Sequence, residues 1–190
     1  MALSSLQLCN CAFIRLGEKP LDDLNGTNAQ TQIVQTLYDP IRNALLSSYR
    51  WSFATKTAAL SLNAQQPETP NGLKRFDLPV DCLTVISTGE TGRSSPKQFK
   101  VQGQSVLSSS NALTLRYIFK PDEGACPPYF DTALIAQLAA EFSIPVTDST
   151  SRTQMLFKMA EEAAQKARAI DAQQDSPDRI GQFNLIDVRG

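Results

Sequence analysis

The clearest structural signal in this chain is the stretch Tyr38-Asp-Pro-Ile-Arg-Asn-Ala-Leu-Leu-Ser-Ser-Tyr-Arg-Trp-Ser-Phe-Ala-Thr-Lys56. The only tryptophan, Trp51, stands near its end, and Phe53 follows two residues later. Large aromatic side chains at such a point fix the angle at which the chain leaves a helix. We therefore predict that a helix passes into an extended segment at Trp51, and that Trp51 packs near Tyr49 and Phe53 between two parts of the protein. The apolar residues that predict this helix recur at the spacing of one helical face, at Ile33, Val34, Leu37, Tyr38, Ile41, Ala44, Leu45 and Tyr49.

The same spacing predicts a helix before this one and sets the limits of both. The first is predicted over residues 4–16 and ends at Gly17, because glycine commonly caps helices in the left-handed conformation. The second is predicted over residues 28–49, with an apolar face that keeps its phase across Pro40. That continuity favours one kinked helix, and the alternative is a break with Asp39 as N-cap and Pro40 at the first helical position. The inner face of the first helix is predicted to carry Leu6, Cys9, Phe13 and Leu16.

Two more helices are predicted towards the end of the chain. One covers residues 129–142 and stops before Pro145, since proline disfavours a helical conformation at the residue before it. The other begins between residues 149 and 151 and ends near residue 174. Its small side chains would let another helix approach closely. The apolar stripe predicted for it comprises Met155, Leu156, Met159, Ala160, Ala163, Ala167 and Ile170.

Between these pairs of helices the pattern changes to strands. Alternating or short apolar runs predict strands at residues 82–88, 99–107 and 112–119. We therefore expect an α+β fold that combines a four-helix bundle with a β-rich insertion between helices two and three and an extended C-terminal tail. The bundle is expected to use residues 1–53 and 126–175, the insertion residues 54–125, and the tail residues 176–190.

Composition excludes several classes of function. The chain has 190 residues, with 18 basic and 19 acidic side chains, so no global charge draws it to nucleic acid or membrane. It has no histidine, which removes the commonest general base and the commonest metal ligand. We therefore expect that the protein is not an enzyme and that it binds no cofactor, no metal and no membrane. The absence of a signal peptide or a long apolar run predicts a soluble protein that is made in the cytosol.

The four cysteines are predicted to be reduced and mostly buried, as cytosolic cysteines usually are. Cys9 and Cys11 are two residues apart on a predicted helix, so their side chains point to nearly opposite faces and cannot hold one metal ion. The others, Cys82 and Cys126, complete no Cys-x-x-Cys motif.

Basic side chains gather in the strand-rich segment, where residues 71–120 carry seven basic and three acidic side chains. Such a group is a candidate to contact phosphates. No recognised nucleic-acid-binding motif accompanies it, so from the residues alone an ordinary solvated sheet face is favoured. The alternative function is a small DNA-binding accessory protein. The candidate contacts to DNA in a channel, or to a tail partner, are Arg93, Lys97, Lys100, Arg116 and Lys120.

Several short motifs, in this order along nearly the whole chain, resemble the tail tubular protein A, or head-to-tail adaptor, family of short-tailed bacteriophages. The fullest motif is Tyr-Asp-x-x-Arg-x-x-Leu-Leu at Tyr38–Leu46, followed by Trp-x-Phe-Ala-x-Lys at Trp51–Lys56. The Leu-Pro-x-Asp-Cys of Leu78–Cys82 resembles a strand entry of that family. The remaining matches are Leu8-Cys9-Asn10, Leu16-Gly17-Glu18, Leu113–Ile118, Phe130–Pro145 and the helix end at Ala163–Gln173.

This resemblance implies a structural virion protein without catalysis. It implies a ring of about twelve copies, whose interfaces are heterologous and closing. The ring would bind the portal protein, receive the tail nozzle protein and surround DNA that passes without sequence recognition. The protein would be in the host cytoplasm before assembly and in the virion tail or neck afterwards.

The last residues are the candidate portal-docking segment. Pro177 and Gly181 end the helical pattern, and apolar side chains follow them. Exposed apolar segments mark interfaces, and adaptors of the family reach the portal through their C-terminal ends; the alternative is that the tail packs back on the helices. The family ending Trp-Leu-x-x-Arg is absent, and Phe183 stands in for its tryptophan. The predicted docking residues are Phe183, Leu185, Ile186, Val188 and Arg189.

Overall fold

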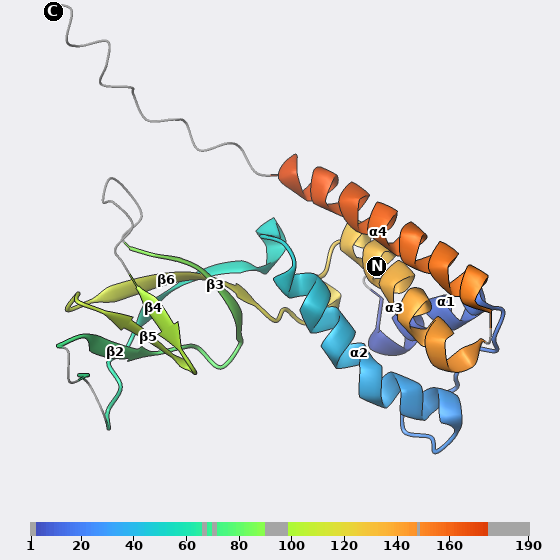
Figure 1. The fold of residues 1–190 in the computed structure, drawn as a ribbon, viewed down its shortest axis with the longest axis horizontal. Coiled ribbons are helices and arrows are strands. Elements are labelled where there is room, and N and C mark those ends of the chain that lie inside the picture. The colour runs from blue at the N-terminus through green and yellow to red at the C-terminus, as the bar shows by residue number, and fades with distance from the viewer. Residues whose placement is uncertain (1–2, 66–67, 70–71, 90–98, 148, 175–190) are drawn as a thin grey trace, which may run out of the picture.

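The computed structural model describes residues 3–65, 68–69, 72–89, 99–147 and 149–174. Within these ranges the chain is a mixed α+β protein with four α-helices and two three-stranded antiparallel sheets. The strands lie at one end of the molecule and the helices at the other (Figure 1). The helices are α1 (Ser5–Leu16), α2 (Ala29–Ser47), α3 (Pro128–Val146) and α4 (Thr150–Ala172). The strands, all between α2 and α3 in sequence, are β1 (Thr55–Leu60), β2 (Lys74–Asp77), β3 (Cys82–Thr88), β4 (Lys100–Gln102), β5 (Ser105–Ser108) and β6 (Leu113–Phe119).

The helix ends follow from local capping. Ser4 and Gln7 form a capping box, in which each side chain accepts a hydrogen bond from the other residue's backbone N–H. Gly17 ends α1 with a φ of 77°, a conformation that glycine adopts without strain. Asn28 and Ser149 cap α2 and α4 through their side-chain oxygens. The predicted limits of these three helices are therefore confirmed to within about two residues.

Two prolines test the helix predictions in opposite ways. Pro40 lies inside α2, which is one helix from Ala29 to Ser47, so the continuous interpretation is confirmed. Pro145 lies inside α3, so the prediction that this helix stops before Pro145 is wrong. Pro145 is in the last turn, where a missing N–H removes only one hydrogen bond. The helix end is still held there, because the N–H of Thr147 donates to the carbonyl of Ser143 at 2.9 Å.

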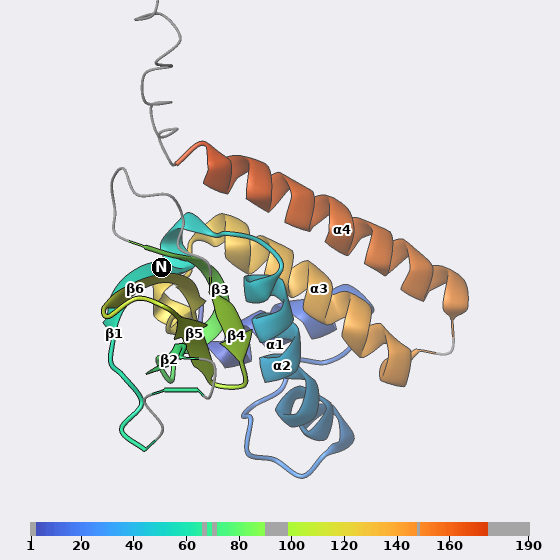
Figure 2. The same cartoon turned by 60° about the vertical axis from the view of Figure 1, so that its left-hand side comes forward.

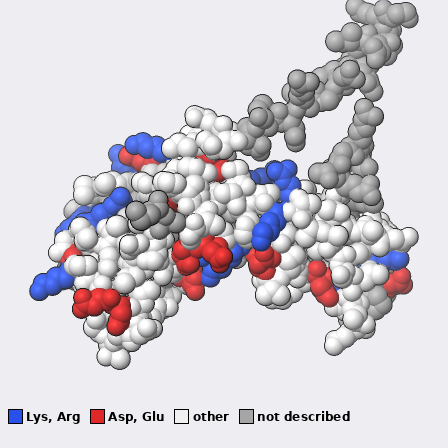
Figure 3. All heavy atoms as spheres, turned by 180° about the vertical axis from the view of Figure 1, so that it is seen from behind, with Lys and Arg blue, Asp and Glu red and all other residues white. Residues whose placement is uncertain are grey.

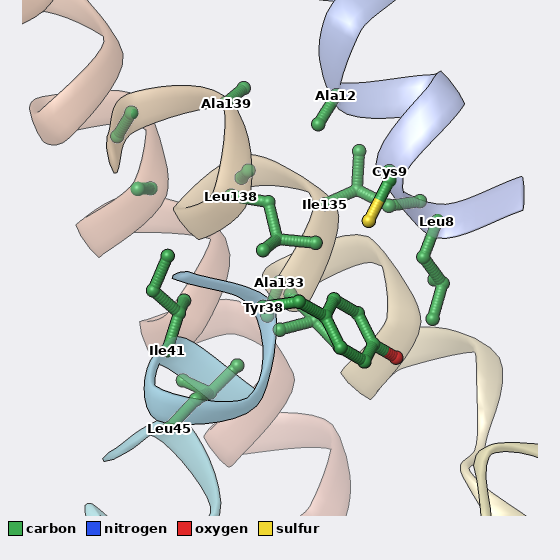
Figure 4. Close-up of a cluster of buried hydrophobic side chains, with 14 of the residues drawn as sticks. Leu8, Cys9, Ala12, Tyr38, Ile41, Leu45, Ala133, Ile135, Leu138 and Ala139 are labelled. Atoms are coloured by element: carbon green, nitrogen blue, oxygen red, sulfur yellow. The ribbon is translucent and has the colours of Figure 1, made fainter. Parts of the chain in front are cut away.

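All four helices bury side chains in one hydrophobic cluster. Figure 4 shows its centre, where Leu8 and Cys9 of α1 meet Tyr38 of α2 and Leu138 of α3. Trp51 belongs to the same cluster and is fully buried. Its ring lies 5.1 Å from that of Tyr49 and 6.0 Å from that of Phe53, so the predicted aromatic group is confirmed.

The strands form two small sheets with orders β1-β6-β3 and β2-β5-β4. The predicted strand at residues 82–88 is confirmed, and that at 112–119 is observed one residue shorter. The predicted strand at 99–107 is two strands, because the chain turns at Gly103, where φ is 59°. The two sheets share a small core of Phe76, Val106, Leu113, Leu115 and Tyr117.

The central strand β6 belongs to both cores, because successive side chains point to opposite faces of a sheet. Leu115 and Tyr117 face the other sheet and are buried in the small core. Ile118 points the opposite way and is buried in the helix cluster. Through β6 the helices and the sheets pack against one another directly.

The helix α4 lies along α3 on the outside of the molecule (Figure 2). Its predicted apolar stripe is only partly correct. Met155, Met159 and Ile170 are 55%, 49% and 41% exposed. The buried face is displaced toward small side chains because alanines let α4 approach α3 closely. It consists of Leu156, Ala160, Ala164, Ala167 and Asp171.

Candidate interaction surfaces

The residues predicted to dock on the portal, Phe183, Leu185, Ile186, Val188 and Arg189, lie outside the described residues. So do two of the five predicted DNA or tail-partner contacts, Arg93 and Lys97. The structure places the other three, Lys100, Arg116 and Lys120.

Lys100 and Arg116 are both exposed, but the fold does not bring them together. Arg116 is on the face of β6 opposite Leu115 and Tyr117, so it points away from the second sheet. Lys100 pairs with Leu107 in its sheet, while the next pair, Val101 with Val106, is on the face of the small core. The two cations therefore lie on different sheets, each on the face that points away from the small core.

Lys120 is engaged in an ion pair. Its Nζ lies 2.7 Å from Oδ1 of Asp39 on α2. A second ion pair joins Lys56 to Asp81 at 3.2 Å, and Lys56 also lies 3.6 Å from the ring centroid of Phe119. Acidic and basic side chains are interspersed over the face in Figure 3. The described cations thus do not form one continuous basic surface on this face.

The chain crosses between helices and sheets twice. Residues 48–54, which lead from α2 into β1, are the outgoing crossing, and residues 120–126, which lead from β6 into α3, are the return crossing. Both are held by buried polar side chains from the helices.

The return crossing is held by the polar residues of the Tyr-Asp-x-x-Arg motif. Arg42 is 1% exposed, and its Nη2 donates to the carbonyl of Pro121. Its Nη1 lies 3.7 Å from Oε1 of Glu123, which also lies 3.5 Å from the hydroxyl of Tyr38. The third motif residue, Asp39, binds Lys120. All three polar side chains of the motif thus contact residues of this crossing.

A buried carboxylate of α3 also faces Arg42. Asp131 is buried, and burial raises its pKa to about 6, against the opposing effects of Arg42 and the backbone N–H of Leu3. Its Oδ1 has no hydrogen-bond partner in the described structure. Such an incompletely satisfied buried acid costs free energy when it is ionised.

The outgoing crossing is held by aromatic packing and by Asp171 near the end of α4. The indole N–H of Trp51 donates to the carbonyl of Leu45 at 3.1 Å. Asp171 is buried and accepts hydrogen bonds from the backbone N–H and hydroxyl of Ser52, at 2.9 and 2.8 Å. It also accepts one from the hydroxyl of Tyr129 at 2.7 Å. Burial and this carboxylate raise the pKa of Tyr129 to about 12.

Sequence reasoning did not single out Arg42, Asp131 or Asp171 as buried. A signal was present for two of them, because each continues the buried face of its helix. Arg42 follows Tyr38 by four residues, and Asp171 follows Ala167 by four. A charged residue that falls on the buried face of a helix is predicted to be buried itself and to have a polar or charged partner.

A groove of about 690 Å³ runs between α3 and α4. Small side chains of α3, including Ala136 and Ala139, form one wall, and the exposed Met155, Met159 and Ile170 belong to the other. Tyr129 lies at the end of the groove near Ile170, and Arg15 and Arg152 lie at the opposite end. The groove is mostly apolar, so it fits an apolar segment better than a charged ligand.

The described residues offer little reactive chemistry. They hold no group of three acidic or cysteine side chains placed to bind a metal ion. The four cysteines are free, as predicted; Cys9 and Cys126 are buried, whereas Cys11 and Cys82 are half-buried. Burial raises the pKa of Cys9 to about 12 and also raises that of Cys126, so both thiols stay protonated at neutral pH.

Among the described helices, none is both long enough and apolar enough to span a bilayer. No protein-family model matches the sequence, and no curated protein matches it at a significant level. A function for the chain is therefore inferred from its residues and their geometry.

Proposed function

We propose that this chain is a head-to-tail adaptor of a short-tailed bacteriophage. In this proposal it is a structural virion protein that forms a ring, joins the portal protein to the tail nozzle protein and extends the DNA channel. Its helices form a four-helix bundle, its strands are a β-rich insertion, and residues 176–190 are a tail that docks on the portal.

One observation carries the proposal: motifs that lie far apart in the sequence and resemble the family separately meet in space. Asp171, at the end of the last helical motif, binds Ser52 between Trp51 and Phe53 of another. Ile118, which ends the Leu113–Ile118 motif, packs in the same cluster as Trp51. The contact of Asp171 with Ser52 is polar and specific, so it supports a common structure for the two motifs.

The proposed mechanism is assembly. An adaptor must transmit a fixed geometry from the portal on one side to the nozzle on the other. The two crossings suit that role, because buried polar and aromatic contacts hold the sheets firmly against the helices. Ring closure would need heterologous interfaces, and we expect a free monomer that forms the ring only on the portal template.

The decisive experiment mixes the full chain with the portal of the phage that encodes it and examines the mixture by negative-stain electron microscopy. The expected result is an added ring beneath the portal. A second sample uses a chain that lacks residues 176–190. This truncated chain should keep the helical circular dichroism of the full chain but add no ring to the portal. Portal particles unchanged by the full chain would contradict the proposal.

The DNA-binding alternative is distinguished by a titration with duplex DNA at several salt concentrations. Binding that neutralises phosphates weakens steeply as salt increases. The geometry gives this alternative little support, because Lys100 and Arg116 lie on different sheets and Lys120 is paired with Asp39. Tight, salt-dependent binding without any portal binding would replace the adaptor proposal with the DNA-binding one.

A further inference from the structure

The groove between α3 and α4 exposes large apolar side chains that the described part of the chain leaves uncovered. Met155, Met159 and Ile170 are about half exposed, and they recur along one side of α4. Single exposed apolar residues are common on protein surfaces, but a row of them beside a groove marks a surface that another segment covers.

The chain carries a segment of suitable chemistry next to this groove. The described structure ends at Gln174, just beyond α4, and residues 175–190 follow. Their most apolar part, Phe183-Asn-Leu-Ile-Asp-Val188, has four apolar side chains in six residues. Pro177 and Gly181, which precede it, favour a change of chain direction.

The length of this segment suits the part of the groove that holds the methionines. Ile170 and Met155 are separated by about 22 Å along α4, at 1.5 Å per residue. The five steps from Phe183 to Val188 span about 17 Å in an extended chain, so the segment covers most but not all of that distance. Residues 175–182 can reach up to about 26 Å when extended, which is ample for the chain to reverse direction after α4.

The groove is also lined by Glu162 and Lys166, one acid and one base, so its net positive charge lies at the end with Arg15 and Arg152 and favours one orientation of the segment. A chain that folds back from the end of α4 runs from Ile170 toward Arg152, so Asp187 comes to the end of the groove where Arg15 and Arg152 lie. Arg152 donates to the carbonyl of Leu16 at 2.8 Å, but within the described residues neither arginine has a carboxylate partner. An opposite charge at this end stabilises the reversed segment.

We propose that residues 183–188 bind in the groove between α3 and α4 of their own chain. Phe183 and Leu185 cover the exposed Met159 and Met155, and Asp187 approaches the two arginines. This inference does not depend on the proposed adaptor function. If both hold, the portal competes with the groove for the same segment, and the free protein keeps its apolar tail covered until the portal is present.

The methionines allow a direct test in the full chain. The chain has three methionines, two of which line the groove, so selective ¹³C labelling of methionine methyl groups gives three NMR signals. Met155→Leu and Met159→Leu assign the two groove signals. Phe183→Leu, which removes the aromatic ring and keeps an apolar side chain, is expected to shift the groove signals and leave that of Met1 unchanged. Leu185→Ser with Ile186→Ser is expected to move them to the positions of a solvent-exposed methionine.

The matched control is Phe99→Leu, which changes a partly exposed aromatic residue in the strand region and should shift neither groove signal. The spectra are recorded over a dilution series. Shifts that do not change on dilution support binding within one chain. Shifts that disappear on dilution would assign the groove to a second copy and overturn the proposal. Groove signals that stay unchanged in every tail variant would also overturn it.

Discussion

Of the two crossings that join the helices to the sheets, the outgoing one depends mainly on aromatic packing and the return one on charged groups. Trp51 is buried among three aromatic rings, and the acid beside it, Asp171, receives three hydrogen bonds. On the return crossing, Arg42 is buried against one partly exposed acid, and Asp131 has an oxygen without a partner. Both crossings fix the same two parts, but they should respond differently to mutation and to pH.

The largest expected effect is at the centre of the outgoing crossing. Trp51→Ala removes the largest fully buried side chain and leaves a cavity among Tyr49, Phe53 and Phe130. We expect the free energy of unfolding to fall by about 3–5 kcal/mol. Urea denaturation followed by circular dichroism measures it, and Phe99→Ala is the control at an exposed aromatic. A loss below about 1 kcal/mol would mean that packing at Trp51 does not hold this crossing.

Removal of Arg42, the buried cation at the return crossing, should lower the free energy of unfolding. Arg42→Ala deletes the donor to Pro121 and leaves Glu123 and Asp131 without their positive neighbour. Breaking a buried ion pair costs about 3–5 kcal/mol, and we expect about 3 because Glu123 is partly exposed. The same denaturation assay is used, with Arg50→Ala as the control at an exposed arginine. Equal stability of the two variants would show that the return crossing does not depend on its buried charge.

Charge on the return crossing also predicts a dependence on pH. The pKa of Asp131 is about 6 in the folded protein, above its ordinary value of 3.8. Between these values the folded state binds more protons than the unfolded state, so the contribution of Asp131 to stability decreases as pH rises from about 4 to 6. At one pKa unit per 1.36 kcal/mol, the loss is about 2–3 kcal/mol. Above pH 6 it stays constant.

Asp131→Asn should therefore flatten the pH dependence of stability between pH 4 and 6. Unfolding free energies are measured at several pH values for the wild type, for this variant and for Asp22→Asn, which changes an exposed acid. We expect the Asp22 variant to follow the wild type. If the stability of Asp131→Asn changed with pH as steeply as that of the wild type, Asp131 would not cause the pH dependence. The two crossings would then not differ in their response to pH.

The sequence predicted the parts of this fold that local signals control. Ser4, Gly17 and Asn28 set helix ends through contacts within a few residues, and those ends were predicted closely. The aromatic group at Trp51 was also predicted, because its members are neighbours in the chain. The continuation of α3 through Pro145 was missed, since the tertiary core rather than local preference decides that ending.

The candidate surfaces were harder to predict because they depend on how distant elements pack. The exposure of Met155 follows from the exact rotation of α4 on α3, which alanines permit and periodicity does not specify. Lys100 and Arg116 lie in different sheets. Their separation could be predicted only from the pairing of the strands, which local patterns do not specify. The partners of Asp171 lie more than forty residues away, so no local pattern reveals them.

The smallest effect is expected at the polar contact of the outgoing crossing. Asp171 accepts two hydrogen bonds from Ser52 and one from Tyr129. In Asp171→Asn the amide nitrogen replaces one acceptor oxygen, so at least one donor loses its partner. Neighbouring aromatic packing remains, and we expect a loss of about 1–2 kcal/mol. Glu161→Gln on the exposed side of α4 is the control and should change stability by less than about 0.5 kcal/mol. A loss at Asp171 as large as that of Trp51→Ala would mean that both crossings depend on buried charge.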